Sequence, residues 1–504
     1  MTSKQEIINF FNNKKYNDVI ENYNQAPFSN DHDILLMVGV SYSLQSKYSD
    51  AIKCFQSAYK INKSIDSLYN IAITYALTND ADKAIKIYLE IIALDKNHLS
   101  SYINLSDIYI KNKKYNLAIN ILKDIVPKNI NNLLLNYNYA VALSENKLYE
   151  EAIEFFDKTL NVDSSFSDAI YNRANCLKNI GMLDDAIDIY KNLINHNNND
   201  HESKFNLGIC SLLKGDLKNG LDLYENRFNL KENYTYSYLP KGKSLLDNPR
   251  AESKSTILVI YEQGFGDSIN FSCYLNFLKN NFNNVICLIQ KELLSLFEES
   301  FDCRFFTDSK VLPRYDYHIF MASLPLYVYR KGGSLQNQTS YLKVSDGYKD
   351  KWKSKINLDK KNIGISWHTT KSSLLDKSID DLDFLNNLSN KFNYFCLHNK
   401  ISSKGKEIIN QMPHIYEYCD EINDFHDTAS ICSLMDYVIT IDTSVAHLSS
   451  ALGIKTQLLL AHVPDWRWKI SGRDTIWYKN TNILRQKKDN DWKSLLESLF
   501  INLR

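Results

Sequence analysis

Hydrophobic and polar positions along residues 1–230 alternate with a helical period, and the pattern is itself repeated. The block Tyr-Ser-Asp-Ala-Ile around Ala51 returns as Tyr-Glu-Glu-Ala-Ile around Ala152 and as Leu-Asp-Asp-Ala-Ile around Ala186. The central small residue recurs at spacings of 33, 34, 34, 34 and 34 residues, at Ala51, Ala84, Ala118, Ala152, Ala186 and Gly220. A large residue follows each of them four positions later, on the same helix face. The pattern predicts an all-α solenoid of six or seven helical pairs.

This unit resembles the tetratricopeptide repeat in both period and residue types, with degenerate copies around Val19 and Gly208. The matching positions in the first helices are Gly39, Tyr42, Tyr75 and Tyr109. The resemblance implies a concave surface that binds a protein, a peptide, a glycan or a second copy of the chain as a homo-oligomer. Packing and solvation are the alternative roles of the repeated tyrosines and asparagines.

The pattern changes after residue 230. Residues 231–255 have no helical period and contain Pro240 and Gly242, so they read as a connector. Short apolar runs then alternate with helical segments, at 256–261, 284–289, 317–321, 362–367, 394–397, 437–441 and 456–460. Such runs predict Rossmann-like α/β folding with parallel sheets covered on both faces. A stretch without period near residue 340 divides the region into lobes at 256–345 and 346–504, with the strand ends facing a shared cleft.

The first candidate site is the loop Glu-Gln-Gly-Phe-Gly-Asp at residues 262–267, between a predicted strand and an amphipathic helix. Gly264 and Gly266 allow a tight turn and a close approach of backbone to ligand. Ile269 stands where the dinucleotide fingerprint needs a third glycine, and no Gly-Lys-Ser/Thr makes the loop a P-loop. Asp267 is either the N-cap of that helix, accepting N–H bonds from the next turn, or an acid displayed for chemistry.

The second candidate site opens the helix that follows the strand at 437–441. Thr443 and Ser444 follow Asp442 and open the helix, His447 lies four and three residues after them on the same side of the first turn, and Gly453 ends the helix. Hydroxyls, free backbone N–H groups and the helix dipole suit a phosphate or diphosphate there. The alternative is structural: a hydroxyl that caps the helix and a histidine that faces the core would give the same sequence.

Together these loops resemble bacterial tetratricopeptide-repeat glycosyltransferases whose catalytic region is similar to the heptosyltransferase-like GT-B family. The likeness runs from about Tyr224 to Trp492, in five ordered blocks at residues 262–271, 424–429, 442–453, 464–468 and 472–492. It implies transfer of a sugar from a nucleotide-sugar donor, with the donor in the C-terminal lobe and the acceptor facing the N-terminal lobe. No cofactor beyond that co-substrate, and no metal, is expected.

The resemblance also implies residue roles. Asp267 matches the acid that the family places in its first glycine loop, and it becomes the candidate general base. Without a metal, the departing diphosphate must be met by helix N-termini, hydroxyls and bases, which assigns Thr443, Ser444 and His447 to it while Asp442 holds the loop. Gly264 and Gly266 are further candidates for binding the donor phosphates.

The chain departs from the family after the strand at 362–367. Relatives commonly carry Gly-Asn-Pro, a histidine and Arg-Ser there, whereas this chain offers His368, Lys371 and Lys377 as candidate phosphate ligands. Arg473 is a further phosphate candidate. His398 stands where relatives have glutamine, and the connector lacks their Trp-Asp-Gly. Residues 465–468 are either a packed lobe-closing segment or a sugar contact.

Composition narrows the partners. A chain of 504 residues with 44% hydrophobic and 23% charged residues is ordinary multidomain globular protein. Lysine plus arginine equals aspartate plus glutamate at 59 each, so nucleic acid is not an expected partner. Nine cysteines without C-x-x-C pairs and a first segment without an apolar core predict a cytoplasmic location. No apolar run approaches the ~20 residues of a transmembrane helix.

The sequence therefore predicts a metal-independent glycosyltransferase whose repeats recruit a protein, glycan or lipid-linked acceptor. The alternative is a non-catalytic repeat scaffold with a degenerate glycosyltransferase domain. The altered segment 368–378 favours that alternative, and the retained Asp267 and His447 oppose it.

Overall fold

The computed structural model describes residues 3–25, 28, 30–230, 240, 242–248, 250–335, 340–356, 359–368, 378–379 and 382–503. It divides into two compact units, Met1–Ile180 and Gly181–Arg504, which are described separately. Among the described residues, no helix is long and apolar enough to cross a membrane.

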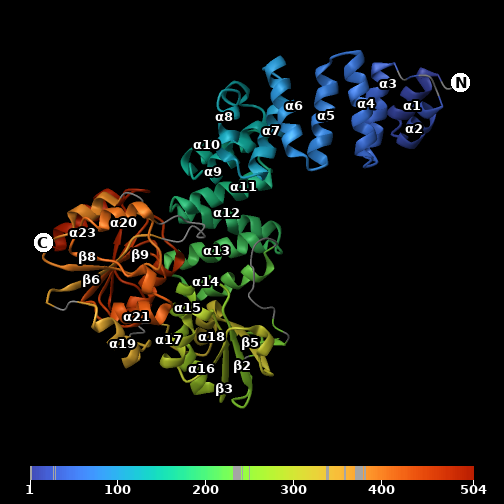
Figure 1. The fold of residues 1–504 in the computed structure, drawn as a ribbon. Coiled ribbons are helices and arrows are strands. Elements are labelled where there is room, and N and C mark those ends of the chain that lie inside the picture. The colour runs from blue at the N-terminus through green and yellow to red at the C-terminus, as the bar shows by residue number, and fades with distance from the viewer. Residues whose placement is uncertain are drawn as a thin grey trace. The chain divides into compact units, whose positions relative to one another are not determined.

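The first unit consists of paired helices joined by short turns (Figure 1). The helices are α1 (Lys4–Asn12), α2 (Tyr16–Asn24), α3 (His32–Leu44), α4 (Tyr48–Ile61), α5 (Ile65–Leu77), α6 (Ala81–Leu94), α7 (Leu99–Lys111), α8 (Tyr115–Leu122), α9 (Leu133–Glu145), α10 (Tyr149–Val162) and α11 (Ser167–Asn179), with the 3-10 turn η1 (Pro127–Asn129). The predicted all-α solenoid is confirmed.

The repeated small residues have a packing role. Ala51, Ala84, Ala118 and Ala152 have no exposed surface. A Cβ atom added at Gly39 would lie 2.4 Å from the ring of Phe55, the large residue four positions after Ala51. The small position therefore lets two helices approach, and the aromatic ring fills the space beside it.

The turn inside each pair has its own signature. A left-handed residue recurs there at Lys14, Ser46, Asn79, Lys113 and Lys147, and glycine takes the same place at Gly181 and Gly215. The left-handed conformation ends the first helix and reverses the chain.

The repeat pattern continues into the second unit. Its first elements are α12 (Leu183–His196), α13 (His201–Lys214), α14 (Leu217–Tyr224) and the 3-10 turn η2 (Glu225–Asn229). The last repeats therefore belong to the same compact unit as the α/β region.

The N-terminal lobe is built on a five-stranded sheet of order β1-β5-β2-β3-β4, in which every pairing is parallel. Its strands are β1 (Lys243–Ser244), β2 (Thr256–Ile260), β3 (Asn284–Leu288), β4 (Arg304–Phe306) and β5 (Tyr317–Phe320). Its helices are α15 (Phe265–Ser272), α16 (Leu275–Asn281), η3 (Lys291–Leu293), α17 (Leu294–Ser300), η4 (Ser309–Val311), η5 (Met321–Ser323) and α18 (Leu324–Arg330).

The C-terminal lobe holds a six-stranded parallel sheet of order β11-β10-β9-β6-β7-β8. Its strands are β6 (Asn362–Ser366), β7 (Asn393–Cys396), β8 (Ile415–Tyr416), β9 (Tyr437–Ile441), β10 (Thr456–Leu460) and β11 (Thr481–Arg485). Its helices are α19 (Asp346–Lys353), η6 (Leu382–Asn387), α20 (Ser403–Ile409), η7 (Cys419–Glu421), α21 (Phe425–Ser433), α22 (Ser444–Ala451), η8 (Trp466–Trp468) and α23 (Trp492–Leu503). The predicted parallel α/β class is confirmed.

Each sheet has a topological switch point. The first central strand of each lobe, β2 or β6, pairs with the next strand of the chain on one side and with a much later strand on the other. Ligands of doubly wound sheets bind where the strand order reverses, beyond the carboxyl ends of those strands. In this chain those positions are the loops after β2 and β5 and the loops after β6 and β9.

Candidate functional site

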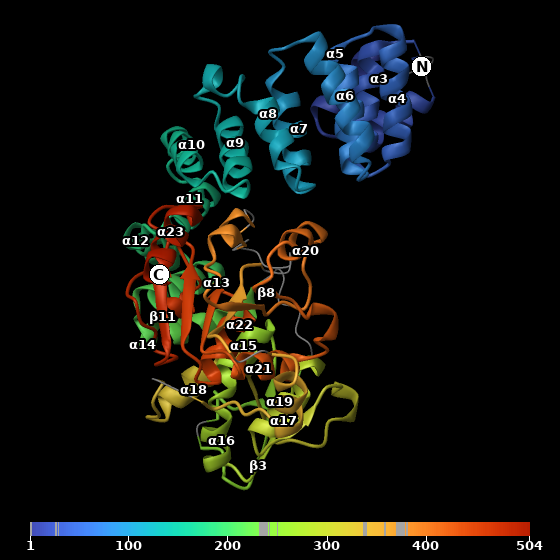
Figure 2. The same cartoon turned by 60° about the vertical axis from the view of Figure 1, so that its left-hand side comes forward.

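The two loops singled out in the sequence lie against each other. A Cβ atom added at Gly266, near the start of α15, would lie 3.0 Å from Cδ2 of His447 and 3.5 Å from Cα of Ser444 in α22. Figure 2 shows α15 and α22 side by side, in agreement with their contacts. Both loops also occupy the switch point of their sheet, so the fold brings two helix N-termini from separate lobes to one place.

Asp267 is the third residue of α15, whose N-cap is Gly264, and it is also a member of an ion pair. Its carboxylate accepts the N–H of Gly264 at 3.1 Å and pairs with the guanidinium of Arg467 from the other lobe. Its side chain keeps 22% exposure, whereas that of Arg467 keeps 6%. Burial raises the pKa of Asp267, and the Arg467 charge opposes the rise. The prediction that Asp267 is the N-cap is therefore wrong by three positions, because α15 begins at Phe265, and its chemical role stays a prediction.

Arg467 contacts the glycine loop of the other lobe, which the sequence did not predict. Its guanidinium donates to Asp465 at 2.7 Å and to Oε1 of Gln263 at 3.0 Å, besides its pair with Asp267. Its Nε is buried without a partner among the described residues. The block at residues 464–468 marked this arginine, but its partner lies 200 residues earlier in the chain, and no local pattern reveals such a pair.

His447 faces the protein interior. The residue is 4% exposed, its ring stacks on Trp468 with centroids 4.9 Å apart, and Nδ1 lies 3.0 Å from the hydroxyl of Tyr478. That hydroxyl donates to Oδ1 of Asn270 in α15 at 3.0 Å. The histidine thus belongs to a buried network that joins α22 to α15.

The start of α22 remains half-buried. Thr443 is the N-cap, and its hydroxyl accepts the N–H of Val445 at 3.3 Å. Ser444 is the first helical residue. Asp442 accepts the indole N–H of Trp468 at 2.7 Å, which ties the start of the loop to η8.

The remaining phosphate candidates do not share one environment. His368 is exposed just beyond β6, with Nδ1 3.3 Å from the hydroxyl of Ser378. Lys371 and Lys377 lie outside the described residues. Arg473 is exposed, and its backbone carbonyl accepts the N–H of Ile483.

The block at residues 424–429 fastens the two lobes. Asp424 caps α21 by accepting the N–H of Asp427 at 3.0 Å, and it also accepts the hydroxyl of Ser295 in α17 at 2.8 Å. Asp427 accepts the indole N–H of Trp352 at 2.8 Å and the ammonium of Lys351 at 2.6 Å. The Asp427 carboxylate therefore has a structural role between α19 and α21.

A buried ion cluster supports the glycine loop from the repeat side. Arg227 has no exposed surface and donates to both carboxylate oxygens of Glu262, at 2.9 and 3.0 Å. Glu262 also accepts the N–H of Ala322 at 3.1 Å, and Glu225 accepts from Arg227 and Ser323. Sequence reasoning missed Arg227 because it lies in a degenerate repeat, where only its neighbour Glu225 hints at a charged pair.

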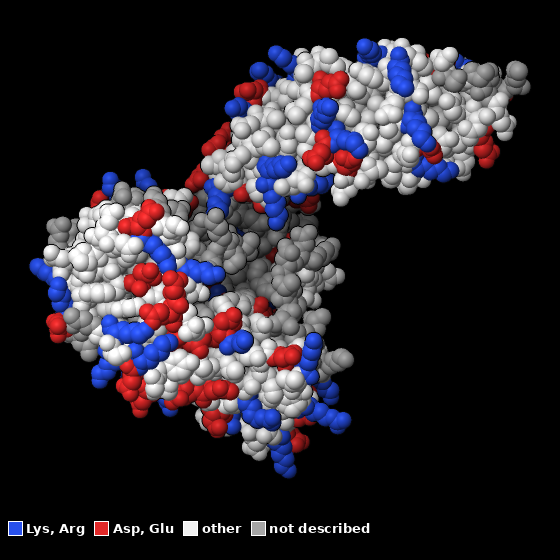
Figure 3. All heavy atoms as spheres, viewed as in Figure 1, with Lys and Arg blue, Asp and Glu red and all other residues white. Residues whose placement is uncertain are grey.

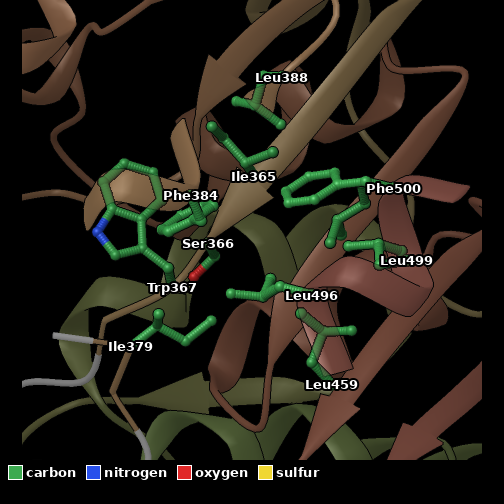
Figure 4. Close-up of a pocket in the computed structure, with 11 residues that line it drawn as sticks. Ile365, Ser366, Trp367, Ile379, Phe384, Leu388, Leu459, Leu496, Leu499 and Phe500 are labelled. Atoms are coloured by element: carbon green, nitrogen blue, oxygen red, sulfur yellow. The ribbon is translucent and has the colours of Figure 1, made fainter. Parts of the chain in front are cut away.

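A small apolar cavity of about 20 Å³ lies beside the carboxyl end of β6 (Figure 4). Ser366, Trp367, Ile379, Leu496 and Leu499 are among its lining residues. The Ser366 hydroxyl is buried without a partner among the described residues. This volume has room for about one water molecule. The cavity by itself therefore gives no support for a nucleotide site.

Two further observations concern possible metal ligands and the distribution of surface charge. Within the described part of the chain, no group of three or more His, Cys, Asp or Glu side chains is placed to hold a metal ion. On the face shown in Figure 3, acidic and basic side chains are interspersed over both units. The expected independence from metal and from nucleic acid stays a prediction.

Sequence models of the tetratricopeptide repeat match residues 65–98, 99–126, 134–166 and 168–197. The N-terminal part of the chain is therefore a tetratricopeptide-repeat solenoid, a class of module that commonly serves as a protein-interaction scaffold. No curated protein matches the chain.

Solved structures similar to the chain are repeat proteins. YrrB, described as a tetratricopeptide-repeat protein with an unusual peptide-binding site, is 18% identical over 36% of this chain and 93% of its own, with a TM-score of 0.33. The C-terminal part of a repeat protein from Cytophaga hutchinsonii is 16% identical over 45% and 95%, with a TM-score of 0.39. MamA from Desulfovibrio magneticus is 15% identical over 32% and 93%, with a TM-score of 0.31.

Proposed function

We propose that the chain is a glycosyltransferase of the GT-B type, which moves a sugar from a nucleotide-sugar donor to an acceptor hydroxyl. One observation carries the proposal: the loops after β2 and β9, each at the switch point of its sheet, meet around an acid whose side chain stays partly open to solvent. The family resemblance of these same loops supplies the reaction class.

Asp267 serves as the general base. Its carboxylate takes the proton of the acceptor hydroxyl while that oxygen forms a bond to the anomeric carbon of the donor sugar. The bond from this carbon to the diphosphate oxygen breaks, and the nucleoside diphosphate leaves with the electron pair. A pKa raised by burial strengthens the base, and the neighbouring Arg467 favours its ionised form.

The start of α22 receives the departing diphosphate. Thr443 and Ser444 offer hydroxyls there, and the helix N-terminus offers N–H groups and a positive dipole. The ring of His447 packs against Gly266, so it fixes the distance between α22 and Asp267. Its network through Tyr478 to Asn270 supports the same geometry.

The substitution Asp267→Asn tests the base. Asparagine retains an oxygen that accepts the Gly264 N–H but cannot take a proton, so we expect turnover to fall about 10²–10⁴-fold with donor binding retained. The measurement is single-turnover release of nucleoside diphosphate. Asp80→Asn, at the N-cap of α6, is the matched control and keeps normal turnover. Normal turnover in Asp267→Asn would reject the proposed base.

The repeats recruit the acceptor in this proposal. A solenoid surface suits a protein or peptide, and a glycan or lipid-linked saccharide is the other acceptor class implied by the resemblance. The competing function is a scaffold with a degenerate transferase domain. It is favoured by the burial of His447 and by the pairing of Asp267 with Arg467. Binding without turnover in the wild-type chain would support that scaffold.

A further inference from the structure

We propose that the final repeat, α13 and α14, helps to position the candidate site, and that Tyr224 and Gln263 are positioning residues for Asp267. This inference rests on the proposed function for its catalytic meaning, but its structural content stands on contacts in the second unit. It assigns to a repeat helix a task other than binding a partner.

The first step is a chain of three polar contacts. The hydroxyl of Tyr224, the last residue of α14, accepts the amide N–H of Gln263 at 2.7 Å. The carbonyl oxygen of the same Gln263 side chain accepts a guanidinium N–H of Arg467 at 3.0 Å. Arg467 in turn pairs with Asp267. One glutamine therefore transmits the position of the repeat helix to the arginine that holds the acid.

The second step is the burial of the two ends of this chain, Tyr224 and Arg467, while Gln263 between them is half-buried. Tyr224 is 2% exposed and its ring lies 5.3 Å from that of Trp466, next to Arg467. The side chain of Arg467 is 6% exposed. Hydrogen bonds between groups shielded from water fix orientation more strongly than surface bonds, and losing one leaves its partner unsatisfied.

A second anchor comes from the same repeat. Arg227, three residues after Tyr224, donates hydrogen bonds to both carboxylate oxygens of Glu262, the residue before Gln263. Two adjacent residues at the start of the glycine loop are thus held by two residues at the end of the repeat array. The loop backbone is also bound on its far side, where the amide of Gln290 donates to the Gln263 carbonyl at 3.1 Å.

The final repeat also contacts the other lobe. The N–H of Ile470, just after η8, donates to the carbonyl of Leu213 in α13 at 2.8 Å. A Cβ atom added at Gly215 would lie 3.5 Å from the Lys469 side chain. Because α13 and α14 touch segments of both lobes, they set where Arg467 and the glycine loop meet.

The test removes one hydroxyl. Tyr224→Phe keeps the buried ring and deletes only the acceptor of the Gln263 amide. The matched control is Tyr88→Phe, because Tyr88 occupies the same repeat position and its hydroxyl accepts the amide of Asn104 at 3.2 Å. Hydrogen–deuterium exchange of the full chain, read in peptides covering residues 262–268 and 465–468, is the measurement.

We expect amide exchange in those two peptides to become about fivefold faster in Tyr224→Phe, as for the loss of one part-buried hydrogen bond, and to stay unchanged in Tyr88→Phe. Gln263→Met removes the hydrogen bond to Tyr224 and also the one from Arg467, so the loosening should be at least as large. Adding Tyr224→Phe to it should produce no further change, because Gln263→Met has already removed the interaction with the Tyr224 hydroxyl. Unchanged exchange in both single variants, or equal loosening in the Tyr88 control, would overturn the proposal.

A second readout separates this proposal from the proposed function. With a nucleotide sugar that stabilises the wild-type chain, Tyr224→Phe should lower the rate of nucleoside diphosphate release about tenfold with donor KM unchanged. If no UDP-, GDP-, ADP- or dTDP-sugar binds the wild type, the transferase proposal fails, while the exchange experiment still decides the positioning role. An unchanged rate in a variant with a loosened loop would overturn the claim that this contact positions Asp267.

Discussion

At the scale of single residues, His398 is a buried histidine that is held neutral by its surroundings. It lies buried just beyond β7, and its Nε2 accepts the N–H of Trp367 at 3.2 Å. Burial, and then the nearby His368, lower the pKa of His398 to about 3. The neutral imidazole of His398 therefore serves as the acceptor for the backbone N–H of Trp367.

The lowered pKa predicts a pH dependence of stability. The unfolded histidine titrates near 6.5, so its contribution is complete above pH 6.5 and is lost as pH falls from 6.5 toward 3. The slope from this group reaches at most about 1.4 kcal/mol per pH unit. His398→Gln should remove that part of the acid sensitivity. Urea midpoints of the two proteins between pH 7 and pH 4.5 are the measurement, and parallel curves would contradict the burial of a neutral histidine.

At the scale of elements, the repeats are joined by polar side chains as well as by their apolar faces. The amide of Asn104 in α7 donates to the hydroxyls of Tyr69 in α5 and Tyr88 in α6, at 3.0 and 3.2 Å. The same spacing recurs where Asn172 donates to Tyr137 at 3.2 Å. The repeated asparagine is therefore, in these pairs, an interface residue of the solenoid.

This interface role predicts unequal costs for one substitution. Asn104→Ala should destabilise the chain by about 1–2 kcal/mol, because it leaves the buried Tyr88 hydroxyl without that donor. Asn70→Ala is the control at the same repeat position, where the amide donates at 2.8 Å only within its own helix, to Asp66, and should cost less than about 0.5 kcal/mol. Chemical denaturation followed by circular dichroism compares them. Equal costs would show that the asparagines act only within their own helices.

The approach of α15 to α22 predicts a second contrast. Gly266→Ala places a methyl group 3.0 Å from His447, so we expect a loss of about 1–3 kcal/mol and weaker nucleotide binding. Gly264→Ala meets only the Asp267 carboxylate at 3.6 Å, an ordinary contact, and should leave stability nearly unchanged. Melting temperatures of the two variants test this. Equal melting temperatures would mean that the two helices do not meet as described.

At the scale of the whole molecule, the sequence predicted the elements better than their connections. The 34-residue period and the apolar runs were sufficient for the solenoid and for the inner strands of both sheets, because each depends on local spacing. The edge strands β1, β4, β8 and β11 were not predicted. The first three have only two or three residues, too few to show a period, and β11 contains only two apolar residues, Ile483 and Leu484. The period also gave no sign that the last repeats share a compact unit with the lobes.

The candidate site likewise contains residues that the local sequence indicates and partners that it does not. Glycines, an acid and hydroxyls after a strand are visible locally, so the loops containing Asp267 and Thr443 were identified from the sequence. The partners Arg467 and Arg227 were not assigned to those loops, because ion pairs across 200 and 35 residues follow from tertiary packing. Lys371 and Lys377, which lie outside the described residues, remain predicted phosphate ligands.

The most direct test of the central claim is the thermal stability of the full chain against a panel of nucleotide sugars and nucleoside diphosphates, with and without EDTA. A ligand that binds only the folded state at ~100 times its dissociation constant adds about 2.7 kcal/mol, a readily measured rise in melting temperature. The glycosyltransferase account predicts a rise selective for one nucleotide, insensitive to EDTA and reduced in Gly266→Ala. A folded sample whose melting temperature no member of the panel raises would contradict that account and leave the repeat scaffold as the function of the chain.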